Sequence, residues 1–118
     1  MRSLILLLAA LAAPCHAADW TRADTTREAA FLSFGALDWL QTRSALKHPD
    51  LYKETNRFIG AHPSRADVNV WFGFGLAAHV GIAVALPPKY RAPFQYVTIG
   101  LEAGQVARNF RIGVRIEI

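Results

Sequence analysis

The chain has 118 residues, of which 53% are hydrophobic and 19% carry a charge. This length fits one domain, and the charged fraction lies below the roughly 25% of an ordinary soluble domain. The high hydrophobicity excludes an intrinsically disordered chain, and the mean hydropathy of +0.18 is consistent with a membrane protein. The net charge of +4 comes from basic residues scattered along the chain, a distribution that does not favour nucleic acid as a partner.

The N-terminus has the pattern of a secretory signal peptide. Arg2 supplies a positive charge, and the ten apolar residues 4–13 that follow it are too few to span a bilayer. Small side chains at Cys15 and Ala17 stand at the −3 and −1 positions of a cleavage site. We therefore expect residues 1–17 to be a signal peptide and the protein to be exported, with an uncleaved N-terminal anchor as the alternative.

Residues 18–118 are expected to form a single helical domain with three helices. The first, residues 27–47, follows three residues that favour a helix cap and ends before Pro49. The second, residues 68–86, is stopped by a pair of prolines. The third, residues 93–111, begins with a proline, which suits the first turn of a helix. The sequence therefore predicts an all-α, hairpin-type bundle of three helices.

The second predicted helix is the strongest candidate for a membrane span. Residues 68–86 contain no formal charge, and at ~1.5 Å rise per residue they extend ~28 Å, close to the thickness of a hydrocarbon core. Small side chains recur every four residues and so share one face, where a second backbone comes close. These helix-packing candidates are Gly73, Ala77, Gly81 and Ala85. We expect a protein embedded in the inner membrane, with a soluble periplasmic domain as the alternative.

The segments between the predicted helices are polar. Residues 50–67 are expected to form a polar connector, residues 89–91 a short basic turn, and residues 114–118 alternate like a lone strand. Three spans after signal cleavage place the connector and the C-terminus in the cytoplasm, and the positive-inside rule favours this orientation. That side carries Lys47, Lys53, Arg57, Arg65, Arg108, Arg111 and Arg115, against Arg22, Arg27, Lys89 and Arg91 on the other side.

Polar residues near the middle of the predicted helices are the main candidates for function. Asp38, His79 and Glu102 each fall in a different helix, and a carboxylate in lipid costs roughly 2.5–3.5 kcal/mol unless it faces a partner or a cavity. One hypothesis is an interior cluster with His79 between the two carboxylates, which relays protons or binds a small polar ligand. The cluster would be extended by Thr42, Thr98 and Gln105.

Two alternatives remain for these residues. The polar side chains act as contacts that fix helix register, or the first and third helices lie along the membrane surface and leave both carboxylates in water. On the third helix, polar side chains recur at spacings of three and four and so form one stripe. This stripe consists of Gln95, Thr98, Glu102, Gln105 and Asn109.

The connector holds a second group of candidates. Glu54, Asn56, His62 and Ser64 are the side chains outside the helices best suited to bind a ligand, with local turn and cap hydrogen bonds as the alternative. The spacing of the histidines matches no compact metal motif, and the chain has neither a dinucleotide-binding glycine pattern nor a nucleophile elbow. We therefore expect no metal, no cofactor and no catalytic residues.

Several short segments of the chain carry a resemblance to other proteins. They are Asp38-Trp39-Leu40-Gln41-Thr42, Glu54-Thr55-Asn56, Gly60-Ala61-His62-Pro63-Ser64, Leu86-Pro87, Tyr96-Val97-Thr98-Ile99-Gly100, Glu102-Ala103-Gly104 and Arg108-Asn109. In this set the chain resembles a group of small membrane proteins from proteobacteria and their phages. Arg57 stands where related sequences usually have proline. The group carries no assigned activity, so the resemblance implies a compact helical membrane protein and a phage context, without catalytic residues.

The sequence thus favours a non-enzymatic membrane component. It would act through helix packing with a second copy of itself or with another membrane protein, in contact with lipid. A small membrane carrier or enzyme that uses Asp38, His79 and Glu102 is the first alternative. A soluble periplasmic helical domain, in which residues 68–86 form the central core helix, is the second.

Overall fold

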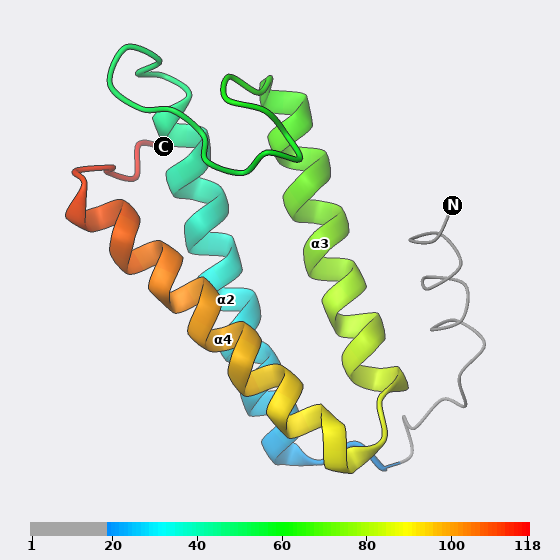
Figure 1. Cartoon of the computed structure of the whole chain (residues 1–118). Coiled ribbons are helices and arrows are strands. Elements are labelled where there is room, and N and C mark those ends of the chain that lie inside the picture. Colours follow the sequence, from blue (N-terminus) through cyan, green and yellow to red (C-terminus); the bar gives the residue numbers. More distant parts are fainter. Residues whose placement is uncertain (1–18) are drawn as a thin grey trace.

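The computed structural model describes residues 19–118. These residues form three α-helices, α2 (Arg22–Ala45), α3 (Arg65–Ala85) and α4 (Pro88–Arg111), and contain no strand. The chain therefore runs up α2, down α3 and up α4 (Figure 1). The all-α prediction with three helices is confirmed. Residues 1–17, assigned above to a signal peptide, lie outside the described residues.

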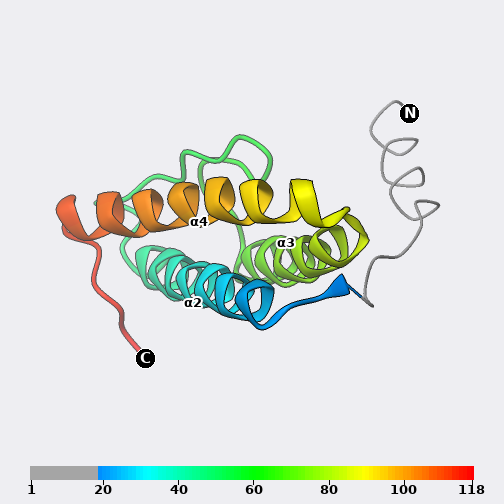
Figure 2. The same ribbon diagram turned by 90° about the horizontal axis from the view of Figure 1, so that it is seen from below.

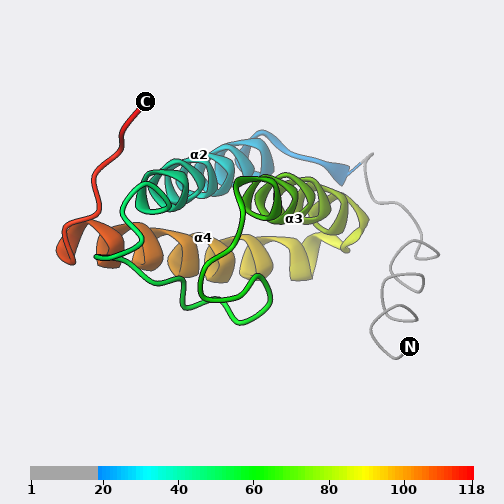
Figure 3. The ribbon, with the colours of Figure 1, turned by 90° about the horizontal axis from the view of Figure 1, so that it is seen from above.

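The three helices do not pack equally against one another. Helix α4 lies across the pair formed by α2 and α3 (Figure 2), and its contact with α2 is far more extensive than its contact with α3. Helices α3 and α4 meet at the short turn 86–87 and diverge toward the opposite end (Figure 1). There the connector 46–64 leaves α2, extends past α4 and returns to α3 (Figure 3).

Helices α2 and α3 both begin earlier than predicted because each starts with a capping box. The Thr21 hydroxyl accepts a hydrogen bond from the Asp24 N–H at 3.1 Å, and the Asp24 carboxylate accepts one from the Thr21 N–H at 2.8 Å. Ser64 and Asp67 repeat this exchange at 3.0 and 2.9 Å. Each pair satisfies two backbone donors at the helix start and so fixes the first turn.

The third helix also begins before its predicted start. Pro88 occupies the first turn of α4, where its missing N–H and fixed φ angle are tolerated, and Pro93 lies inside the helix. The prediction of a basic turn at residues 89–91 is therefore wrong. The predicted strand at residues 114–118 is also absent, since those residues are irregular and have no neighbouring strand with which to form a ladder.

The C-terminal segment folds back onto the end of α2. Gly113 has a φ angle of +96°, which turns the chain after α4. The Glu117 N–H then donates to the Ser44 hydroxyl at 2.8 Å, and the Glu117 carboxylate lies 2.7 Å from His48 Nε2. The hydrogen bond to His48 holds the pKa of the Glu117 carboxyl below its ordinary value. These contacts tie the C-terminus to the connector end of the bundle.

Gly35 of α2 lies directly against Leu76 of α3. A Cβ atom at this position would lie 2.5 Å from Cδ2 of Leu76, so only glycine fits without a shift of that side chain. The small-residue face of α3 is used differently. A Cβ at Gly73 would lie 3.9 Å from the Trp39 ring, and a Cβ at Gly81 would meet no described atom within 4 Å. The middle of that face is therefore open in the single chain.

The bundle buries more polar and charged residues than hydrophobic ones. Among the described residues, nine polar or charged residues are buried against six hydrophobic ones. Large apolar side chains point outward from the middle of the helices, among them Val70, Phe74, Val97 and Leu101. The interior of this bundle is therefore held together largely by polar contacts.

Candidate functional site

The polar stripe predicted on α4 faces α2, where a second row of polar side chains meets it. Gln95 is fully buried and Asn109 is 8% exposed, and both donate hydrogen bonds to groups on α2. The contacts between the helices form two separate groups. One lies near the turn 86–87, and the other lies beside the connector 46–64.

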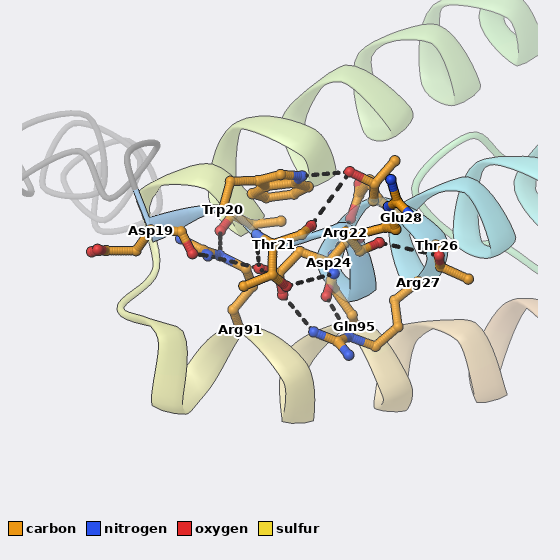
Figure 4. Close-up of polar contacts among 12 residues, drawn as sticks. Asp19, Trp20, Thr21, Arg22, Asp24, Thr26, Arg27, Glu28, Arg91 and Gln95 are labelled. Carbon is orange, nitrogen blue, oxygen red and sulfur yellow. Dashed lines mark hydrogen bonds and ion pairs between the residues drawn. The ribbon is translucent and has the colours of Figure 1, made fainter.

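Arg91 is the centre of the first group. We call this group the basal network, and it consists of Asp24, Arg27, Glu28, His79, Arg91, Gln95 and Thr98. The Arg91 side chain is fully buried and donates to the carbonyl oxygens of Ala83 and Leu86 at 2.7 and 3.0 Å. It also donates to the Asp24 carboxylate at 3.1 Å (Figure 4). One guanidinium therefore satisfies the terminal carbonyls of α3 and joins that helix to α2 and α4.

Asp24 of α2 and Gln95 of α4 extend the basal network between these two helices (Figure 4). The Asp24 carboxylate accepts a short hydrogen bond from Arg27, whose Nε donates to the amide oxygen of Gln95 at 2.8 Å. The Gln95 amide nitrogen donates to the Asp24 carbonyl at 3.1 Å and to the Glu28 carboxylate at 2.9 Å. The Trp20 ring covers the Arg91 guanidinium at 4.9 Å. The network thus encloses its charges on several sides.

His79 connects α3 to the same network. Its Nδ1 lies 2.7 Å from the Glu28 carboxylate and its Nε2 lies 2.7 Å from the Thr98 hydroxyl. An ionised carboxylate only accepts hydrogen bonds, so Nδ1 carries a proton. The imidazole ring stacks between Phe31 and Phe94, with centroid distances of 3.5 and 4.5 Å. Both carboxylates of the basal network, on Asp24 and Glu28, therefore face a basic side chain.

The second group of polar residues lines a cleft of about 770 Å³ between the diverging ends of the helices. We call this the connector cleft, because the connector covers its end. Helix α2 contributes Asp38 and Thr42, and α4 contributes Glu102, Gln105 and Arg108. Helix α3 contributes Arg65 and apolar side chains. The connector residues that line it include Glu54, Thr55, Asn56, Ile59 and His62.

The carboxylates in the connector cleft lack the basic partners found in the basal network. Asp38 is 8% exposed, and its carboxylate accepts a hydrogen bond from the Asn109 amide at 2.8 Å. It lies close enough to Glu102 and Glu54 to be repelled by both. The buried Oε2 of Glu102 has no hydrogen-bond partner. Within residues 19–118, no ion pair involves any of these three carboxylates.

The predicted polar cluster is thus divided between the two groups. His79 and Thr98 belong to the basal network, whereas Asp38, Thr42, Glu102 and Gln105 line the connector cleft. The hypothesis that placed His79 between the two carboxylates does not describe its partners, which are Glu28 and Thr98.

The connector candidates have mixed roles. Asn56 makes a local turn, in which its N–H donates to the Glu54 carboxylate at 2.8 Å and its side chain accepts from the Phe58 N–H at 3.0 Å. The Ser64 side chain caps α3 and is not part of the cleft lining. Glu54, Asn56 and His62 line the cleft.

Several residues of these groups were not predicted as site candidates. Arg27 and Arg91 were considered only for membrane topology and Gln41 only within the resemblance, whereas Asp24 and Glu28 were not considered as site residues. Gln41 is fully buried and its side chain bonds Val106 and Asn109 on α4. A signal was present, since Glu28 and Gln41 lie on the same face of α2 as Asp38 at helical spacings.

The chemistry of the two groups does not point to a metal. Within residues 19–118, no group of three or more His, Cys, Asp and Glu side chains is arranged to hold a metal ion.

Comparison of the chain with protein-family models, with curated proteins and with solved structures gives no match.

Proposed function

We propose that the protein is a non-enzymatic component of the inner membrane, a bundle of three membrane-embedded helices that packs through α3 against a second protein chain. The observation that carries this proposal is the polarity of the bundle, which buries more polar than hydrophobic residues and exposes large apolar side chains along its helices. In water such a surface is unfavourable, whereas in lipid it is the expected arrangement.

Helix α3 gives the most direct support for a membrane location. Among the described helices, only α3 is long and apolar enough to cross a membrane, with a mean hydropathy of 1.6 over its best window. The core helix of a soluble protein passes the same test, but such a helix is mostly buried. Only 17% of the window in α3 is buried. This exposure favours lipid as its surroundings over the interior of a periplasmic domain.

Helices α2 and α4 carry charges, but the charges in their central parts face inward. Between Arg27 and Arg43 the charged residues of α2 are Glu28 and Asp38, and both are buried. Between Arg91 and Arg108, α4 has only Glu102, which lines the connector cleft. At ~1.5 Å per residue these central segments are ~24 and ~26 Å long, near the thickness that a tilted helix must cover.

The ends of the bundle support one orientation. The connector 46–64 and the C-terminal segment lie at the same end (Figure 1), and this end carries the larger number of Lys and Arg residues. At the opposite end, Arg27 and Arg91 are engaged in ion pairs with Asp24. The positive-inside rule then places the connector in the cytoplasm.

Membrane fractionation with an alkaline carbonate wash tests the location. We expect the protein to stay in the membrane pellet after the wash, because three apolar helix surfaces hold it there. N-terminal sequencing of the same material should begin at Ala18. Recovery of the protein in the wash or in the periplasmic fraction would contradict the proposal and favour the soluble domain.

Assembly through α3 is tested by the substitution Gly81→Leu. The position is open in the single chain, so a larger side chain should leave the fold intact but block the approach of another helix. We expect the variant to elute as a smaller species than the wild type in size-exclusion chromatography with light scattering in detergent.

Gly100→Leu is the matched control, since a Cβ at Gly100 on α4 also meets no described atom within 4 Å. It should leave the assembly unchanged. Equal particle sizes for the wild type and both variants would show that α3 does not mediate assembly.

A further inference from the structure

We propose that the connector cleft is a binding site for a small organic cation, an amine with an apolar substituent, whose ammonium group lies between Asp38 and Glu102. This inference goes beyond the proposed function, because it concerns the interior of one chain and not its assembly.

The size and lining of the cleft suit such a ligand. Its volume of about 770 Å³ lies in the range of roughly 300–1,000 Å³ that is typical of small-molecule sites. Phe72 and Leu76 of α3 and Ile59 of the connector form apolar walls, whereas α2 and α4 contribute the carboxylates. A ligand with a charged end and an apolar body would match both kinds of surface.

The charges that line the cleft have both signs. Lys53, Arg65 and Arg108 are exposed and, among the described residues, form no ion pair with the cleft carboxylates. Asp38 and Glu102 are less exposed and favour a cation. Asp38 is nine-tenths buried and lies near two other carboxylates, and Glu102 has a buried oxygen atom without a partner.

Leaving the Oε2 atom of Glu102 without a partner is costly, because a buried polar atom that makes no hydrogen bond keeps its full desolvation penalty. In the basal network the protein places a histidine against Glu28 and an arginine against Asp24. In the connector cleft no basic side chain of the described residues pairs with Asp38 or Glu102, so a ligand ammonium group would supply a basic partner.

Hydrogen-bonding capacity favours an ammonium group over a metal ion. An ammonium group has three donors, and the carboxylates of Asp38 and Glu102 offer acceptors. Gln105 can supply a third, since its amide nitrogen donates to Asn109 at 2.9 Å and its amide oxygen is left to accept. A metal ion finds less support, since no group of three or more His, Cys, Asp and Glu side chains within residues 19–118 is arranged to hold one.

Equilibrium dialysis of the purified full chain in detergent with radiolabelled hexylamine tests the site. We expect saturable binding of one hexylamine per chain. Hexanol, which has the same apolar body without the charge, should bind far more weakly. Glu102→Gln should weaken hexylamine binding by about ten- to a hundred-fold, the usual effect of losing one charge-assisted contact. The matched control Glu117→Gln removes a carboxylate outside the cleft and should bind like the wild type.

A second variant fills the connector cleft without changing the charge of its lining. Gly75 lines the cleft, and a Cβ there would meet no described atom within 4 Å, so the side chain in Gly75→Leu should occupy the ligand's volume. We expect this variant to lose hexylamine binding while its melting temperature stays unchanged.

Three results would overturn the proposal: equal binding of hexanol and hexylamine, wild-type affinity in Glu102→Gln, or no saturable binding at all. The last result would mean that protons neutralise the carboxylates. The outcome is separable from that of the proposed function, because Gly81→Leu should bind hexylamine normally even if it no longer assembles.

Discussion

Replacement of Arg91 by methionine is expected to lower the free energy of unfolding by about 3–5 kcal/mol, the cost of removing one partner from a buried ion pair. The guanidinium is fully buried and holds both the Asp24 carboxylate and the terminal carbonyls of α3. Methionine fills similar volume but removes the donor to the Ala83 and Leu86 carbonyls. It leaves the Asp24 carboxylate with its bonds from Arg27 and Thr21 only. The melting temperature should therefore fall by more than about 10 °C in a circular-dichroism melt in detergent.

Lys89→Met is the matched control for this experiment. Lys89 lies in the same turn of α4, but its side chain is exposed and stacks only on the neighbouring Tyr90 ring. The same change of chemistry should therefore leave the melting temperature unchanged. If Arg91→Met melted like the wild type, the basal network would not be what holds the three helices together.

The second large effect is expected for His79→Leu. The imidazole is buried against Glu28 at 2.7 Å, and both side chains are only 6% exposed. Leucine would keep the packing between Phe31 and Phe94 but leave the Glu28 carboxylate without its basic partner. We expect a loss of about 3–5 kcal/mol in the free energy of unfolding, measured by denaturant titration in detergent.

The chain contains its own control for this substitution. His48 and Glu117 form an ion pair of the same length, 2.7 Å, but their side chains are 42% and 43% exposed. Water and counterions screen such a pair, so His48→Leu should not change stability measurably. Similar effects of the two substitutions would mean that burial does not determine the strength of the His79 contact.

The number and type of the helices could be predicted from sequence, and so could the face of α4 that contacts α2. Both depend on local information, since a polar side chain at every third or fourth position marks one side of a helix whatever its surroundings. The helix starts could also have been predicted more closely. Thr21 with Asp24, and Ser64 with Asp67, have the spacing of a capping box.

The partners of the polar side chains could not be predicted in the same way. Spacing shows that Asp38 and Glu102 face inward, but it does not reveal that His79 pairs with Glu28 one helical turn from the Arg91 contacts. Arg91 itself follows two prolines and looks like an exposed basic residue. Its burial depends on the angle at which α4 leaves α3, because only that angle brings the guanidinium beneath the last carbonyls of α3. Such relations between elements are not encoded in local patterns.

The unequal contact among the helices has a mechanical consequence. Helices α3 and α4 contact each other through Arg91 and His79 in the half of the bundle near the turn 86–87 and have few contacts elsewhere, so a change in the angle between them would move their far ends most. At ~1.5 Å rise per residue each helix is at least ~30 Å long. A rotation of ~5° about the turn 86–87 would therefore displace the end beside the connector by ~3 Å. A small angular change at one end is thereby converted into a displacement comparable to the width of a methylene chain at the other.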